Sequence, residues 1–200
     1  AIYYAYGQSR EAMNLNPHLE LFRDKGVEVL YMYEPIDEFV VDAMRDYKEM
    51  PFTAAEHADP ADLAAFESTE KKKAKPRKLT DKQQQTLTDM LKRFKDILGP
   101  QVTEVKASDR LSESPVCLAN PDGNVTSSME KIMRVVSKDT SIPAKVLEVN
   151  PDHPMIRNLL KVYKKDPEDD FLEAAAKQLY ESALLLEGYL QDPHGLVRRI

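Results

Sequence analysis

The sequence of 200 residues is poor in cysteine and glycine, and each shortage excludes a class of protein. Cys117 is its one cysteine, so no disulfide forms within the chain, and a single thiol fits a reducing compartment. Cys117 lies in an apolar strand pattern, where a buried structural thiol is expected rather than a nucleophile. The six glycines form no phosphate-binding loop and no turn around a nucleophilic serine. The sequence therefore predicts no catalytic residue and no bound cofactor.

Long apolar runs and an excess of positive charge are also missing. No stretch approaches the roughly 18 apolar residues of a membrane span, and no signal peptide precedes the first strand pattern. A net charge of −6 and a pI near 5.3 argue against a general affinity for nucleic acid. The four histidines are scattered, without the i, i+4 pairing of a zinc site on a helix. We expect a cytoplasmic protein that binds no metal, nucleic acid or membrane.

Both ends of the chain have the pattern of interrupted elements. It opens on AIYYAYG, already inside a strand pattern, and closes on GLVRRI, an amphipathic stretch without a helix stop. We expect a fragment of a longer protein.

Residues 1–56 alternate strand and helix patterns. The segments 2–7 and 27–33 are aromatic or continuously apolar, as in buried strands, and 50–55 is expected as an edge strand because Pro51 lacks a donor. Helices are expected after Ser9, which offers an N-cap, and after Pro35, with one apolar face along 36–47. A βαβαβ order predicts a small sheet flanked by helices, an α/β/α subdomain.

Residues 57–79 lose this periodicity and contain the basic run KKKAKPRK, so we predict a linker. A second domain, 80–200, opens with the capping box TDKQ at Thr80. An amphipathic helix follows and ends at Gly99-Pro100. The segments 102–108 and 114–120 are predicted to pair as strands, and 144–150 is expected as a third strand. The whole chain is predicted to have an α+β fold.

The segment NVTSSMEKIMRVVS, residues 124–137, predicts a helix with a methionine-rich apolar stripe. Its spacing is typical of a helix buried in the protein's own core. Methionine also adapts to varied partners, so an exposed binding stripe is the alternative. Further along, the helix after Pro167 is apolar over an arc wide enough to pack on two sides, either centrally in its own domain or against a partner subunit.

Several blocks of this sequence, in the same order, resemble the heat-shock protein 90 chaperones, most closely their bacterial branch. IYYAYGQSREAMNLNPHLELFRDKGVEVLYMYEPIDEFVV is similar to the end of the family's middle domain. SDRLSESPVCLAN, LEVNPDHPMIRNLL and LYESALLLEGYLQDPHGLVRRI resemble its C-terminal domain. The resemblance covers 1–53 and 80–200.

The resemblance implies an ATP-driven, homodimeric clamp that binds unfolded or partly folded client proteins. ATP and magnesium bind in an N-terminal domain, and the catalytic arginine precedes these residues, so this chain is expected to lack ATPase activity of its own. The C-terminal domain dimerises through its last two helices in a four-helix bundle, here 168–189 and 192–200. The implied dimerisation residues are Leu172, Ala176, Leu179, Tyr180, Ala183, Leu184, Leu186, Leu196, Val197 and Ile200. The chain stops within the last helix, which is expected to weaken dimerisation.

The resemblance also implies that a short amphipathic helix of the C-terminal domain projects apolar side chains toward clients. The matching residues are Val125, Met129, Ile132 and Met133. With the resemblance, we favour the exposed, client-facing stripe over the core.

Two other functions stay open from the residues alone. One is a structural adaptor that binds a single defined partner through the 168–190 helix. The other is a small α/β enzyme in residues 1–56, which rests only on the strand and helix order.

Overall fold

The computed structural model describes residues 1–67, 79–121, 125–139 and 141–199. The chain divides into two compact units, one of Ala1–Lys73 with Asp122–Ser141 and one of Ala74–Pro121 with Ile142–Ile200. The first unit thus includes the methionine-rich segment, which the sequence placed inside a domain of 80–200. The basic run of the predicted linker lies outside the described residues.

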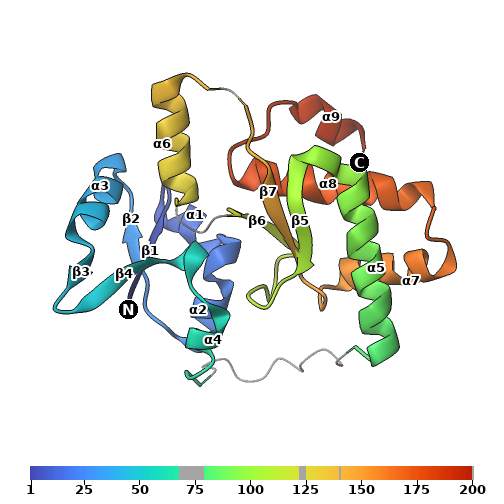
Figure 1. The fold of residues 1–200 in the computed structure, drawn as a ribbon, viewed down its shortest axis with the longest axis horizontal. Helices are drawn as coiled ribbons and strands as arrows, with labels where there is room; N and C mark the ends of the chain where they lie inside the picture. The colour runs from blue at the N-terminus through green and yellow to red at the C-terminus, as the bar shows by residue number, and fades with distance from the viewer. Residues whose placement is uncertain (68–78, 122–124, 140, 200) are drawn as a thin grey trace. The chain divides into compact units, whose positions relative to one another are not determined.

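The first unit contains a four-stranded sheet in the order β2-β1-β4-β3 (Figure 1). The strands are β1 Ile2–Tyr6, β2 Leu30–Met32, β3 Asp46–Tyr47 and β4 Met50–Ala54. β1 runs parallel to both β2 and β4, as the βαβαβ pattern predicts. The edge position predicted for β4 is wrong. A tight turn folds β3 back onto β4, and the Phe52 N–H donates to the Arg45 carbonyl at 2.9 Å.

Successive residues of β1 point to opposite faces of the sheet and so enter two different cores. On one face, Ala5 packs with α1 Arg10–Asn14, α2 Glu20–Lys25 and α4 Pro60–Leu63, joined by the short 3₁₀ turns Pro17–Leu19 and Ala55–His57. On the other face, Tyr4 packs with Val41 of α3 Pro35–Met44. Figure 1 shows α3 on one side of this sheet and α1 and α2 on the other. Helices thus cover both faces of this sheet.

Local signals begin and end these helices. The Ser9 hydroxyl caps α1 by accepting from the Ala12 N–H at 3.2 Å, and Gly26 ends α2 at φ 61°, a conformation that glycine adopts without strain. Residues 57–63 of the predicted linker belong to this unit and contribute to its core, because Ala58 and Leu63 are buried in it.

The second unit contains a three-stranded sheet of β5 Val102–Ala107, β6 Val116–Ala119 and β7 Lys145–Val149. The prediction that the first two strands pair with each other is wrong, since β7 lies between them, parallel to β5 and antiparallel to β6. All five residues of β7 are buried, as expected for the central strand. The local spacing of residues does not show that β7 pairs with two strands that lie far from it in the sequence.

Four helices complete the second unit: α5 Asp81–Leu98, α7 Pro154–Lys165, α8 Asp170–Leu186 and α9 Pro193–Arg198. The predicted capping box begins α5, where the Gln83 N–H donates to the Thr80 hydroxyl at 3.3 Å and the Thr80 N–H donates to Gln83 at 3.0 Å. One face each of α5, α7 and α8 joins the sheet in a single core (Figure 1). The described residues as a whole have the predicted α+β composition, and none of their helices is long and apolar enough to cross a membrane.

Candidate protein-binding surfaces

The methionine-rich segment forms α6 Ser127–Ser137, a helix that buries none of its side chains. The Thr126 hydroxyl caps its N-terminus by accepting from the Met129 N–H at 3.0 Å. Met133 is 58% exposed and Val136 is 78% exposed, while Met129 and Ile132 are half-buried. Val125, just before the helix, is also exposed. The spacing alone favoured burial of this stripe in the core, and the structure does not place it there.

Two carboxylates of the first unit hold the start of α6. The Thr126 hydroxyl donates to Glu38 Oε1 at 3.0 Å. The Ser127 N–H and hydroxyl donate to the two oxygens of Glu56 at 2.9 and 2.7 Å. Acidic groups are favourable at a helix N-terminus, where unpaired amides carry a partial positive charge. The attachment of α6 is thus largely polar.

Glu38 lies on α3 and is 3% exposed. Burial raises the pKa of its carboxyl, and the nearby carboxylates of Glu56 and Asp42 act in the same direction. Hydrogen bonds from Thr126 and Ser128 act in the opposite direction but do not cancel the effect of burial. A proton on Glu38 is therefore more favourable in the folded unit than in water.

The apolar face predicted for α3 is also exposed, and α3 contacts α6. Val41 turns toward the sheet, whereas the stripe that the spacing identified faces outward. Its exposed members are Ile36, Phe39, Val40 and Met44. Val135 of α6 is 79% exposed and adds to the apolar surface, although the predicted stripe omitted it. We call these exposed side chains of α3 and α6 the two-helix surface.

The second unit carries an apolar groove with a cavity volume of about 620 Å³. Its lining comes from the segment 114–116, from α7, from α8 and from Arg199, which follows α9 Pro193–Arg198. Met155 of α7 and Phe171 and Leu186 of α8 line it and are at least half exposed. The groove and the projecting side chains around it lie on one surface of the unit, which we call the α7–α8 surface.

The ten predicted dimerisation residues fall into three groups in the structure. Seven are buried within the core of their own unit: Leu172, Ala176, Leu179, Tyr180, Ala183, Leu184 and Leu196. Leu186 and Val197 are exposed, at 67% and 66%. Ile200 lies outside the described residues. Phe171 and Leu185 of α8 and Met155 of the neighbouring α7 are exposed apolar residues that the prediction omitted. One side of the wide apolar arc of α8 is thus buried in the core of the second unit, and the other side is exposed.

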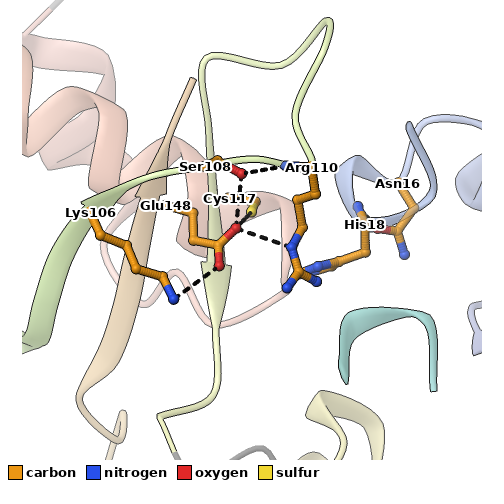
Figure 2. Close-up of polar contacts among 7 residues, drawn as sticks. All are labelled: Asn16, His18, Lys106, Ser108, Arg110, Cys117 and Glu148. Carbon is orange, nitrogen blue, oxygen red and sulfur yellow. Dashed lines mark hydrogen bonds and ion pairs between the residues drawn. The ribbon is translucent and has the colours of Figure 1, made fainter. Parts of the chain in front are cut away.

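A buried carboxylate organises the sheet of the second unit (Figure 2). Glu148 of β7 is 3% exposed and accepts from the Ser108 hydroxyl at 2.9 Å. It also pairs with Arg110 Nε at 3.2 Å and Lys106 Nζ at 3.5 Å, and the Cys117 thiol lies 3.9 Å away. A buried charge is stable only when paired and hydrogen-bonded in this way. Cys117 is buried as predicted, so we assign this cluster to holding three strands together.

The described residues contain no group of three histidine, cysteine or acidic side chains placed to hold a metal ion. The exposed side chains that define the two surfaces are mainly apolar.

Comparison with known proteins identifies the family of this chain. The model of the family described as Hsp90 protein matches residues 1–200. The chain belongs to the Hsp90 family. Among similar proteins, the chaperone protein HtpG of Oleidesulfovibrio alaskensis is 53% identical over 100% of the chain and 31% of its own length. The HtpG of Nitratidesulfovibrio vulgaris is 46% identical over 98% of the chain and 30% of its own length.

The predicted resemblance to the bacterial branch of Hsp90 is confirmed by these relatives. A more distant one, the HtpG of Myxococcus xanthus, is 36% identical over 100% of the chain and 30% of its own length. The chain spans less than a third of the curated Hsp90 relatives that it matches.

Proposed function

We propose that this chain is the part of a bacterial Hsp90-type chaperone that contacts client proteins and joins two subunits. Client contact is assigned to the two-helix surface. The observation that supports it is a helix, α6, with an apolar side but no buried side chain. Soluble proteins rarely leave large apolar patches uncovered unless these bind something. Flexible methionine side chains suit a surface that accepts many sequences.

The test of client contact is a binding measurement with a permanently unfolded probe, reduced and carboxymethylated α-lactalbumin. Met133→Lys places a charge in the middle of the exposed stripe. A buried methionine contributes about 1.5–3 kcal/mol, so loss of roughly half of that weakens binding about 3-fold to 12-fold. Ser137→Lys introduces the same charge on the same helix and is expected to change the Kd less than twofold. Equal effects of the two variants would refute the assignment to the stripe.

Self-association is assigned to the α7–α8 surface. A two-fold interface brings the same patch of both copies together, so that patch must contain both a hollow and something to fill it. The α7–α8 surface has both, since the projecting Phe171 and Leu186 stand at the groove that they help to line. Family membership supports the same proposal in part, because the resemblance implies a homodimer through the last two helices, 168–189 and 192–200, and α8 is one of them.

Sedimentation over a range of concentrations tests self-association. Leu186→Asp puts a charge at the groove and is expected to weaken self-association at least tenfold. Leu15→Asp is the matched control, because Leu15 is an equally exposed leucine of the first unit. A saturable one-to-one complex with one folded protein, without self-association, would instead favour an adaptor.

A further inference from the structure

Two walls of the groove on the α7–α8 surface come from distant parts of the chain, and one buried side chain connects these two walls. Ser114, Pro115 and Val116 form one wall, and α7 supplies another with Met155, Asn158, Leu159 and Val162. Asn150 lies between these parts in the sequence, at the end of β7, and is 1% exposed.

The two ends of the Asn150 amide bind these two parts of the chain. Its Nδ2 donates to the Ser114 carbonyl at 3.0 Å. Its Oδ1 accepts from the Asp152 N–H at 3.0 Å, in the turn that leads into α7. The Asn150 backbone N–H also donates to the Pro115 carbonyl at 2.9 Å. One amide therefore ties the 114–116 wall to the start of the α7 wall.

The turn held by Asn150 is itself fixed to α7. The Asp152 carboxylate pairs with Arg157 Nη2 at 2.5 Å, one turn into the helix. His153 caps α7 by accepting from the Met155 N–H at 3.2 Å. A change in the Asn150 contacts is therefore transmitted to the position of α7 relative to Ser114 and Pro115.

We infer that Asn150 is a positioning residue that sets the width of the groove and thereby the fit of a second copy of this chain. This inference rests on the proposed self-association through the α7–α8 surface. Asparagine suits the role because one side chain presents a donor and an acceptor in a fixed plane. Aspartate has the same shape but no donor, so it places a carboxylate against the Ser114 carbonyl.

The test compares the self-association Kd of the 200-residue chain with that of Asn150→Asp, by sedimentation equilibrium well below the unfolding temperature. We expect the Kd to rise at least tenfold. Asn150→Ser is the second variant, because its hydroxyl keeps an acceptor for the turn but is too short for the Ser114 carbonyl. It is expected to raise the Kd about threefold to tenfold.

Ser108→Ala is the matched control, since it also removes two side-chain hydrogen bonds of the second unit, one to Glu148 and one from the Arg110 N–H, but lies outside the groove lining. It is expected to lower the unfolding temperature and to leave the Kd within twofold of wild type. A Kd within twofold for the folded Asn150 variants overturns the inference. An equal rise for Ser108→Ala also overturns it, because general loosening of the unit then explains the effect.

Leu186→Asp separates this inference from the function on which it rests. If Leu186→Asp weakens association but the Asn150 variants do not, only the positioning role of Asn150 fails. If Leu186→Asp leaves association unchanged, the proposed use of this surface fails as well.

Discussion

The polar attachment of α6 leads to a quantitative prediction for Glu56. This carboxylate accepts two hydrogen bonds from Ser127, at 2.9 and 2.7 Å. Because α6 buries none of its side chains, these bonds carry a large share of its attachment. Glu56→Ala removes both acceptors and leaves the core residues Ala55 and Ala58 in place.

The size of the effect follows from the two bonds. A hydrogen bond to a charged group contributes about 1.5–3 kcal/mol, and the lower value applies here because Glu56 is half-buried. Two bonds then give about 3 kcal/mol, which raises the detached population of α6 about 100-fold. A helix of this length is marginal in water, so the detached segment also unfolds.

Amide hydrogen exchange of Glu130–Ser137 measures this detachment. In Glu56→Ala these amides are expected to exchange about 100 times faster, while the amides of α5 keep their wild-type rates. Ser127→Ala loses the hydroxyl bond but keeps the amide bond, so about half the effect in kcal/mol is expected. Glu67→Ala, at an exposed glutamate, is the control.

An unchanged exchange rate of α6 in Glu56→Ala would refute this reasoning. It would mean that apolar contacts with α3 hold the helix and that the polar contacts are incidental. Faster exchange throughout the first unit would refute it in another way, since the loss would then be one of general stability.

Three further predictions concern stability and activity. Lys48 and Glu49 form the β3–β4 turn at φ 51° and 65°, a conformation that is unfavourable for residues other than glycine. Glu49→Gly should therefore raise the free energy of unfolding of the first unit by about 0.5–1 kcal/mol in urea denaturation, with Glu67→Gly as control; a loss of stability would contradict this. Because the pKa of Glu38 is raised, its contribution to stability is full below the usual glutamate pKa and is lost as pH rises through the raised value. Glu38→Gln should therefore unfold at a higher temperature than wild type near pH 7 and at a similar one below about pH 4; the reverse order would count against it. Finally, we predict that phosphate release from ATP stays at background, because the resemblance implies that ATP binds in an N-terminal domain and that the catalytic arginine precedes these residues; turnover that survives purification and scales with the protein would overturn this.

Local chemistry made several elements predictable from the sequence. Helix ends are one example, because a capping residue contacts backbone groups only a few residues away. The ends set by Thr80 with Gln83, by Ser9 and by Gly26 therefore follow from residue type. The burial of Cys117 followed in the same way from an apolar strand pattern. The family resemblance added what spacing alone does not contain, the exposure of the α6 stripe.

Pairing over long distances was not predictable in the same way. β7 inserts between β5 and β6 because its five buried residues need cover on both faces and both edges, and no local spacing encodes that choice. The edge position of β4 was mispredicted because non-glycine residues adopt positive φ on both sides of β3. Lys48 and Glu49 do so in the turn between β3 and β4, and Arg45 does so at the end of α3.

The sequence by itself determined most of the helices and strands, where many of them start, and that α6 and α8 have apolar sides. It missed β3, which lies within the predicted helical face 36–47, and α4, which lies within the predicted linker. The tertiary structure alone decided which of those sides are covered. The apolar face of α3 turns outward because Glu38 and Val41 take the inner positions, and α8 uses most of its predicted interface residues for its own core. Periodicity defines a face of a helix, but its burial depends on neighbours that the chain brings from far away in the sequence.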